Sequence, residues 1–210
     1  MEDSERIWVQ RATAGDTTAF AQLVSAYQNP VYNVAYRLLG NSVEAEDAAQ
    51  ETFIRAYRYL ETYDSTRKFS SWLLAIASHY CVDVLRRKRL KLLSMDDLPP
   101  MVELSMPTVQ QPEEAVIANQ NADAVQQMLN SLDPSYRTPV VLRYWYDMSY
   151  REIAEAMDVT ESTIKTRLHR ARLKLAALSD SQSQMEPAGE HLIGAPCEAG
   201  KGQVDESTSL

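Results

Sequence analysis

Apolar residues recur at spacings of three and four along most of the chain, whereas strict alternation of apolar and polar residues is scarce. Spacings of three and four place apolar side chains on one side of a helix. They predict helices over residues 4–14, 16–39, 43–60 and 70–91, and again between residues 113 and 178. The pattern therefore predicts an all-α fold, which the low glycine content also favours.

Turn and capping residues set the expected ends of these helices. Asp16 can cap the second helix, Gly40 should end it, and Ser42 should cap the helix that follows. Pro30 lies inside the second helix, so it should kink that helix or restart it.

Pro139, in the second half of the chain, also lies inside a predicted helix. Asp133 and Pro134 form a good N-cap and first-turn pair. Pro139 should then bend the helix that they open, or move its true start to about Thr138. This helix is expected to reach Tyr146.

The helical pattern is interrupted by a segment with four prolines, and no Lys or Arg occurs between Lys91 and Arg137. This composition predicts an extended, acidic linker. Beyond Leu178 the chain is rich in Ser, Gln, Gly, Pro and Glu, as a disordered tail would be. We therefore expect two small helical domains joined by the linker. The predicted boundaries are 1–91 for the first domain, 92–112 for the linker, 113–178 for the second domain and 179–210 for the tail.

Residues 149–178 are typical of a helix-turn-helix. Ser149 and Glu152 have the spacing of a capping box. Asp158 falls at the turn, where Asp tolerates left-handed geometry, and Thr160 or Glu161 opens the second helix. Two helices joined by so short a turn form a layout that places the second helix in the major groove of DNA.

The second helix of this motif has one apolar and one basic side. Its buried stripe is predicted to be Ile164, Leu168, Ala171, Leu175 and Leu178. The candidate DNA-contacting residues are Ser162, Thr163, Lys165, Thr166, Arg167, His169 and Arg170. Arg167, Arg172 and Lys174 lie near the edges of the stripe, so we expect them to contact phosphates rather than bases. The alternative is a solvated amphipathic helix that closes a small bundle.

The predicted helix over residues 43–60 carries a second candidate surface. Its core stripe is expected to be Ala45, Ala49, Phe53, Ala56 and Leu60. Asp47, Gln50, Glu51 and Ile54 share another face. An isoleucine among carboxylates would suit the docking of a basic helix, because it adds apolar area while the acids provide steering. A solvated acidic face with one stray apolar residue is the alternative.

The helix over residues 70–91 combines aromatic and basic residues. Trp72, His79 and Arg86 are seven residues apart and lie along one side, and the helix ends in a basic cluster. Rings that stack on bases and cations that follow the backbone suit single-stranded nucleic acid. The candidate residues are Arg67, Lys68, Phe69, Trp72, His79, Arg86 and Arg87. Alternatively, Trp72 anchors the core and the cations offset the helix dipole.

The net charge of −8 is unusual for a DNA-binding protein, but the charge is unevenly distributed. Residues 95–130 carry six acids and no base, and residues 179–210 carry six acids and one base. Charges more than about 10 Å apart are largely screened at physiological salt, so a local basic face can still meet phosphates. The total charge predicts weak DNA binding by the isolated chain.

Several classes of protein are excluded by composition and spacing. Cys81 and Cys197 are expected to be free thiols of a reducing cytoplasm, and no ligand cluster predicts a metal or cofactor. We find no nucleophile–base pair, phosphate loop or paired carboxylates, so we do not expect an enzyme. The N-terminus has no hydrophobic core of a secretory signal, and no apolar run approaches about 18 residues. We therefore expect a cytoplasmic protein without membrane insertion.

Five segments together resemble a bacterial RNA polymerase sigma factor of the extracytoplasmic-function (ECF) type. They stand in the family's order and span about residues 5–178. The segments are GDTTAFAQLVSAY, AEDAAQETFIRAY, FSSWLLAIASHYCVDVLRRKR, LDPSYRTPVVLRYWYDMSYREIAEAM and STIKTRLHRARLKL.

The resemblance implies a sigma factor that binds core RNA polymerase and directs initiation at promoter DNA. The first domain would read the minus-10 element, with melting carried by the loop 62–69 and the helix after it, and the helix-turn-helix would read the minus-35 element. The linker would correspond to the segment that threads through the polymerase cleft. Asp47, Gln50 and Glu51 match the segment that docks on the polymerase clamp. That segment also includes Phe53, but the helical pattern puts Phe53 in the core, so we predict Ile54 beside the acids.

Family members are commonly held by an anti-sigma protein, so such an inhibitor is a further candidate partner. A free-standing helix-turn-helix regulator is the main alternative function, although the acidic face and the aromatic platform argue against it. A sigma mimic that sequesters another regulator is the second alternative. The residues do not specify the promoter sequence, the inducing signal or the role of the tail, in which Cys197 could act as a sensor or be inert.

Overall fold

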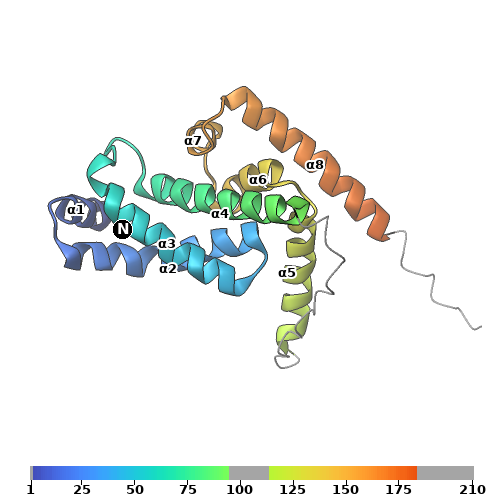
Figure 1. The fold of residues 1–210 in the computed structure, drawn as a ribbon, viewed down its shortest axis with the longest axis horizontal. Helices are drawn as coiled ribbons and strands as arrows, with labels where there is room; N and C mark the ends of the chain where they lie inside the picture. Colours follow the sequence, from blue (N-terminus) through green and yellow to red (C-terminus); the bar gives the residue numbers. More distant parts are fainter. Residues whose placement is uncertain (1, 95–113, 184–210) are drawn as a thin grey trace, which may run out of the picture.

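The computed structural model describes residues 2–94 and 114–183, and every regular element within these ranges is a helix (Figure 1). The prediction of an all-α fold is confirmed. The elements are α1 (Glu2–Thr13), α2 (Thr17–Leu39), α3 (Ser42–Tyr59), the 3₁₀ helix η1 (Leu60–Thr62), α4 (Phe69–Ser94), α5 (Glu114–Asn130), α6 (Pro134–Tyr146), α7 (Tyr150–Ala156) and α8 (Glu161–Ser183).

The first group of helices, α1 to α4, packs around α2, which contacts α1, α3 and α4. Leu23, Val34 and Leu73 are fully buried between these helices. Asp16 caps α2 as predicted, since its carboxylate accepts hydrogen bonds from the backbone N–H groups of the first turn. Gly40 ends α2 with a φ of 72°, a left-handed conformation that glycine adopts without strain.

The second group, α5 to α8, buries Leu129, Leu142, Ile153 and Ile164. It contains the predicted helix-turn-helix, formed by α7 and α8. The helical pattern extends beyond the expected boundaries at two places, because α4 continues to Ser94 and α8 to Ser183. The rest of the predicted linker and tail, including Cys197, lies outside the described residues.

Both prolines of interest lie inside continuous helices. Pro30 neither ends nor restarts α2, and α6 begins at Pro134 rather than at Thr138. A proline removes one N–H group, but its own carbonyl remains an acceptor. The Pro30 carbonyl accepts a hydrogen bond of 2.9 Å from the hydroxyl of Tyr146. Pro139 is buried in the second group of helices, so packing holds α6 together across it.

Two predictions about α3 are wrong in detail. Asn41 rather than Ser42 is the N-cap, and its amide oxygen accepts a hydrogen bond of 3.0 Å from the N–H of Glu44. Either side chain suits a cap, and the helix starts one residue earlier than expected. Its buried stripe is also rotated. The fully buried residues are Ala45, Ala48, Thr52 and Ala56, whereas Ala49 and Phe53 are half-buried.

Thr52 lies in the core because its hydroxyl finds a partner within the helix. It donates a hydrogen bond of 2.6 Å to the carbonyl of Ala48. A buried hydroxyl costs little when it is hydrogen-bonded, so a polar residue is tolerated where the sequence pattern favoured Phe53.

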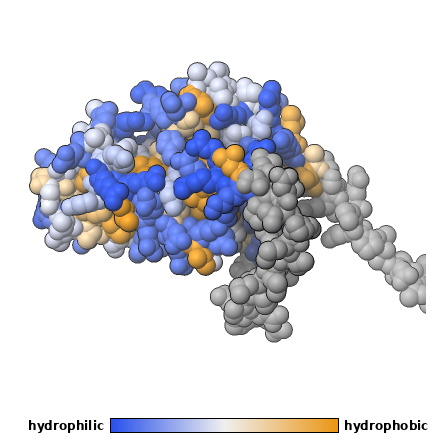
Figure 2. Space-filling view, viewed as in Figure 1, coloured by the Kyte–Doolittle hydropathy of each residue, from blue (hydrophilic) through white to orange (hydrophobic). Residues whose placement is uncertain are grey.

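The two groups of helices pack directly on each other. Helices α5 and α6 contact α2, and α7 lies across α4 (Figure 1). Hydrophilic side chains dominate the face shown in Figure 2, and its apolar residues are scattered. Within the described ranges, no helix has the length and apolar character needed to cross a bilayer.

Candidate nucleic-acid interface

The helix-turn-helix forms through local hydrogen bonds that its sequence predicts. The Ser149 hydroxyl accepts a bond from the N–H of Glu152, and the Glu152 carboxylate accepts from the N–H of Ser149, at 3.2 and 2.8 Å. Asp158 adopts a φ of 51° at the turn. The hydroxyl of Thr160 then accepts a hydrogen bond from the N–H of Thr163 and so caps α8. These predictions are confirmed.

Helix α8 buries one side and exposes the other. Ile164, Leu168 and Ala171 are buried as predicted, Leu175 is half-buried, and Leu178 is exposed. The side chains of Ser162, Lys165, Thr166, His169 and Arg170 are exposed, whereas Thr163 and Arg167 are half-buried. The exposed set shares one face of the first turns of the helix, where it could enter a groove.

Tyr150 is a residue of this site that the sequence did not single out. Its ring lies beneath two cations, with the guanidinium of Arg143 at 5.4 Å and the ammonium of Lys165 at 5.9 Å from its centroid. Arg143 also donates a hydrogen bond of 2.8 Å to the carbonyl of Met148. Tyr150 therefore helps to position Lys165 at the start of the exposed face of α8.

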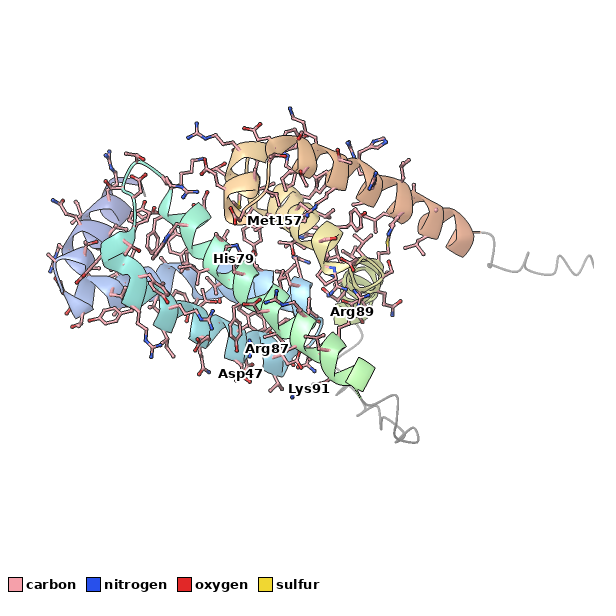
Figure 3. The ribbon with its side chains drawn as sticks, turned by 45° about the horizontal axis from the view of Figure 1, so that its top comes forward. Asp47, His79, Arg87, Arg89, Lys91 and Met157 are labelled. Atoms are coloured by element: carbon pink, nitrogen blue, oxygen red, sulfur yellow. The ribbon has the colours of Figure 1, made fainter. Side chains whose placement is uncertain are left out.

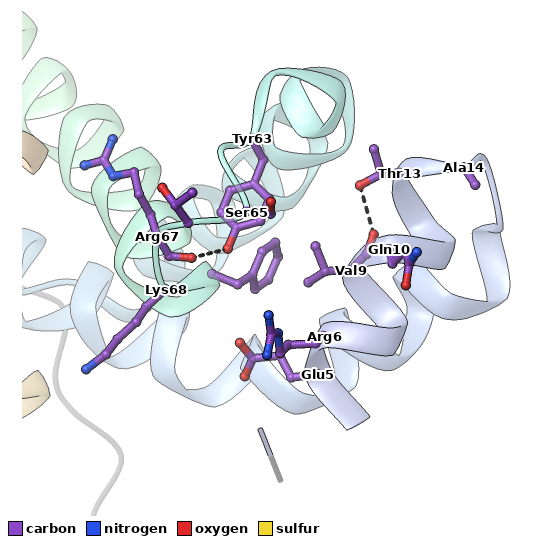
Figure 4. Close-up of a pocket in the computed structure, with 12 residues that line it drawn as sticks. Glu5, Arg6, Val9, Gln10, Thr13, Ala14, Tyr63, Ser65, Arg67 and Lys68 are labelled. Carbon is purple, nitrogen blue, oxygen red and sulfur yellow. Dashed lines mark hydrogen bonds between the residues drawn. The ribbon is translucent and has the colours of Figure 1, made fainter. Parts of the chain in front are cut away.

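A pocket of about 800 Å³ opens between α1 and the loop before α4 (Figure 4). The loop contributes the cations Arg67 and Lys68 and the ring of Tyr63, while α1 contributes Glu5, Arg6 and Gln10 among other residues. The Tyr63 hydroxyl donates a hydrogen bond to the carbonyl of Arg67, which closes the loop. Cations beside an aromatic wall are suited to an unpaired base and its phosphates.

Three aromatic rings meet at the base of this loop. The centroid of Tyr63 lies 5.6 Å from that of Phe69 and 5.2 Å from that of Trp72, and the rings of Phe69 and Trp72 are 5.6 Å apart. Phe69 is buried and Trp72 is half-buried. Phe69 therefore packs against the rings of Tyr63 and Trp72, and it also lines the pocket. Burial is the main reason that the pKa of Tyr63 lies above its ordinary value.

Tyr63 and the contribution of α1 to the pocket were not predicted from the sequence. A tyrosine in a short loop carries no helical period, so only its contacts distinguish it. The wall from α1 depends on how that helix packs on the rest of the domain: the Tyr27 hydroxyl donates a hydrogen bond of 2.5 Å to Glu5 and fixes α1 beside the loop.

The basic cluster at the end of α4 is exposed, but much of it has protein partners. Arg87, Arg89 and Lys91 lie near the end of α4 in Figure 3. Arg86 pairs with Asp83 at 2.8 Å, and Arg89 lies 3.6 Å from a carboxylate oxygen of Asp133 on the other domain. Lys88 pairs with Glu44 of α3. Exposed ion pairs of this kind are weak and easily exchanged for phosphates.

Unlike Trp72, which is half-buried, His79 is exposed, as is Arg86. His79 borders a cavity of about 320 Å³ that Thr138 and Met157 of the second domain also line (Figure 3). The second domain therefore borders α4 at His79 without burying this side chain.

The acidic face of α3 is open to solvent. Asp47, Gln50 and Ile54 are exposed, and the exposed fraction of Ile54 is 46%. Glu51 is half-buried and pairs with Arg55 at 2.7 Å. Asp47, Gln50 and Ile54 are therefore the members of this face that are available to a partner.

Residues suited to metal binding do not gather in the part of the chain that the structure describes. Among these residues, no group of three or more His, Cys, Asp or Glu could hold a metal ion. Cys81 is buried, and burial raises the pKa of its thiol to about 12, so its thiolate is disfavoured.

Known proteins similar to this chain are sigma factors, which agrees with an interface for nucleic acid. Residues 23–91 match the family described as sigma-70 region 2, and residues 122–175 match sigma-70, region 4. The chain is 37% identical over 170 residues to the ECF RNA polymerase sigma factor SigW of Bacillus subtilis (strain 168). That alignment covers 78% of this chain and 90% of SigW.

Two solved structures share the fold across both domains. CnrH in complex with the cytosolic domain of CnrY has a TM-score of 0.64 at 26% identity, covering 85% of this chain and 99% of CnrH. RpoE of Bartonella quintana, in complex with the anti-sigma factor NepR, has a TM-score of 0.60 at 22% identity, covering 77% of this chain and 96% of RpoE. The two matched regions together span more than half of the 210 residues, in the order expected for sigma factors. The chain belongs to the ECF family of RNA polymerase sigma factors.

Proposed function

We propose that this sigma factor binds core RNA polymerase through α3, reads the minus-35 element with α8 and captures unpaired minus-10 bases at the pocket beside Arg67. The observation that carries the proposal is that one chain combines an exposed basic recognition helix with a ring-walled, cation-flanked pocket. Sigma factors are not enzymes, and we assign no catalytic residue to this chain. We place the protein in the cytoplasm, where its polymerase would be.

The proposed domains follow the family regions. Residues 1–91 form the polymerase-binding and minus-10 domain, and residues 113–178 form the minus-35 domain. Residues 92–112 form the linker and residues 179–210 a tail outside both domains. The matches to sigma-70 regions 2 and 4 support the two domain assignments. An anti-sigma protein remains a candidate inhibitor through the family resemblance.

At the minus-10 element, the first domain would stabilise opened DNA. A base that leaves the duplex loses stacking and pairing worth a few kcal/mol, roughly, which a protein pocket must offset. The ring of Tyr63 in the pocket and the ring of Trp72 beside it would offer stacking, while Arg67 and Lys68 would offer charge to the adjacent phosphates. Arg86, Arg87 and His79 would extend this contact along α4.

At the minus-35 element, α8 would enter the major groove. Ser162, Lys165, Thr166, His169 and Arg170 would face base edges, while Thr163 and Arg167, which are half-buried, would lie at the border with the backbone. Phosphate contacts fix register, whereas base contacts carry specificity.

Arg170→Ala is expected to weaken minus-35 recognition by roughly 1–3 kcal/mol and to relax the base preference at one position. The matched variant Arg172→Ala removes an exposed cation that we assign to phosphate, so it should lower activity similarly on all minus-35 sequences. Transcription by the holoenzyme from a library of randomised minus-35 elements measures both. An unchanged base preference in Arg170→Ala would remove this residue from base reading.

Trp72→Ala is expected to reduce promoter opening about fivefold or more while sparing closed-complex formation, because stacking of this kind is worth roughly 1–3 kcal/mol per base. Permanganate reactivity of unpaired thymines reports opening, and footprinting of the holoenzyme reports duplex binding. Tyr144→Ala, which removes an exposed ring of the second domain, is the control and should change neither. Equal loss of binding and opening in Trp72→Ala would indicate a core role.

In vitro transcription with bacterial core polymerase and a promoter library tests the function as a whole. Specific transcripts that require both the chain and the core enzyme are expected. A mobility-shift measurement addresses the alternative, since tight promoter binding by the chain alone would favour a free-standing regulator. No observation on the structure favours that alternative.

A further inference from the structure

The support helix α7 lies on the platform that we assign to single-stranded DNA. Its Glu155 carboxylate pairs with Arg67, and its Glu152 carboxylate accepts a hydrogen bond of 2.8 Å from the hydroxyl of Ser71. Arg67 and Ser71 flank the start of α4, next to the ring cluster. Two carboxylates of the minus-35 domain therefore contact polar groups at the start of α4, and one of these groups, Arg67, lines the minus-10 pocket.

Glu152 is ionised in this contact. Burial opposes its ionisation, but hydrogen bonds from Ser149 and Ser71 outweigh burial, so the pKa of its carboxyl lies below its ordinary value. Glu155 is held from two sides, because Arg151 also donates to it at 3.0 Å. An ionised carboxylate offers anionic oxygens to a guanidinium or hydroxyl, as a phosphate does.

A second set of contacts holds the domains in this arrangement. The last carbonyls of a helix have no partner within it. Those of Arg37 and Leu38, at the end of α2, are capped from the other domain by Gln126 at 3.2 Å and by Arg137 at 2.5 Å. The guanidinium of Arg37 also stacks on the ring of Trp145 at 4.4 Å.

In this arrangement of the domains, the chain cannot contact the minus-10 and minus-35 elements at the same time. Elements named for positions about 25 base pairs apart are separated by about 85 Å of straight duplex, at 3.4 Å per base pair. Helix α7, however, touches α4 and is joined to α8 by only the four residues of the turn. The recognition helix and the minus-10 platform are therefore too close to reach both elements together.

We infer that the carboxylates of α7 are an intramolecular competitor of DNA: the closed chain shields its own minus-10 platform with Glu152 and Glu155, and single-stranded DNA and the closed arrangement exclude each other. This inference rests on the proposed function of the Arg67 pocket. It also accounts for an exposed acid, Glu155, at the edge of a helix whose domain binds a polyanion. Opening of the two domains then precedes or accompanies promoter melting.

The test compares single-strand binding by full-length variants, using a fluorescein-labelled, A/T-rich oligonucleotide of about 12 nucleotides at low salt. Glu155→Gln is expected to raise affinity about threefold to fivefold, the range that one exposed ion pair allows. Glu155→Asp keeps the charge and should stay near the wild-type value. Glu161→Gln makes the same charge change on α8 and should have less effect. Equal affinities of Glu155→Gln and Glu161→Gln would overturn the inference.

Fluorescence energy transfer between dyes on the two domains distinguishes two explanations for a change in affinity. One is competition between α7 and DNA, and the other is the altered net charge of the variant. Dyes on Ser25→Cys in α2 and Ala176→Cys in α8 would report the distance, since both positions are exposed. Cys197→Ser removes the other reactive thiol, and Cys81 is buried. Saturating single strand should lower the transfer efficiency. Binding without any change in transfer would contradict mutual exclusion.

The proposed function is tested separately, by measuring promoter opening with the holoenzyme. If the holoenzyme opens promoters but the free variants bind single strand equally, only the competition is wrong. If the holoenzyme fails to open any promoter of the library, the minus-10 assignment fails and the inference fails with it.

Discussion

The double variant Asp47→Lys/Ile54→Ala is expected to lose capture of core RNA polymerase almost completely. Truncating Ile54 removes apolar area that a partner would cover, worth about 1 kcal/mol for a side chain that is already half-covered. Reversing the charge of Asp47 opposes a like charge on a basic partner and costs several kcal/mol, roughly. A combined loss of about 3 kcal/mol or more weakens binding over a hundredfold.

Both positions are exposed, so the fold should survive the change. Pull-down of core enzyme, with thermal unfolding followed by circular dichroism, measures binding and folding together. The matched control is Glu61→Lys/Ile7→Ala, which also reverses one exposed acid and truncates one exposed isoleucine, but lies outside α3. If the control and the α3 variant retained the same capture, α3 would not be the docking surface.

Arg137→Ala is expected to lower the free energy of unfolding by about 3 kcal/mol or more. Arg137 is 6% exposed and donates to the carbonyls of Leu38, Asn130 and Leu132, at 2.5, 2.8 and 3.1 Å. Each buried acceptor left without a partner costs about 1–3 kcal/mol. Burial lowers the pKa of Arg137 from its ordinary value, yet a guanidinium keeps its charge at neutral pH.

A loss of this size should lower the melting temperature by about 10 °C, since 1 kcal/mol corresponds to roughly 2–4 °C at this chain length. Calorimetry or urea unfolding of the full chain measures it. Arg172→Ala, an exposed arginine of the same domain, should change stability by less than about 0.5 kcal/mol. A melting temperature for Arg137→Ala within about 2 °C of the wild type would show that water replaces the guanidinium without cost.

The helix-turn-helix is the part of the molecule that could be predicted most fully from its residues. The capping box, the left-handed Asp158 and the buried stripe of Ile164, Leu168 and Ala171 all follow from interactions within a few residues. Helices α2 and α4 were predicted for the same reason. For Pro30 and Pro139 the sequence left two outcomes open, and packing between helices decided against a restart of α2 or α6 at either proline.

The candidate site was only partly predictable. Asp47 and Ile54 were found because an exposed face of one helix follows from its period. Tyr63 and the wall from α1 were missed, since they join a loop to a helix about 50 residues away in sequence. Phe69, assigned to single-stranded DNA as an aromatic residue next to cations, is 2% exposed but lines the pocket, so its role stays a prediction.

The helices of this chain, most of their caps and the resemblance to the sigma family could be predicted from local sequence patterns. Periodicity and short motifs reflect interactions over a few residues, so they are visible in the sequence. The meeting of the two domains was decided by tertiary packing alone. Nothing within α7 indicates that Glu152 and Glu155 face Ser71 and Arg67, and nothing near Arg137 indicates that it caps α2. Such contacts join residues more than 80 positions apart, and their partners depend on where whole helices lie.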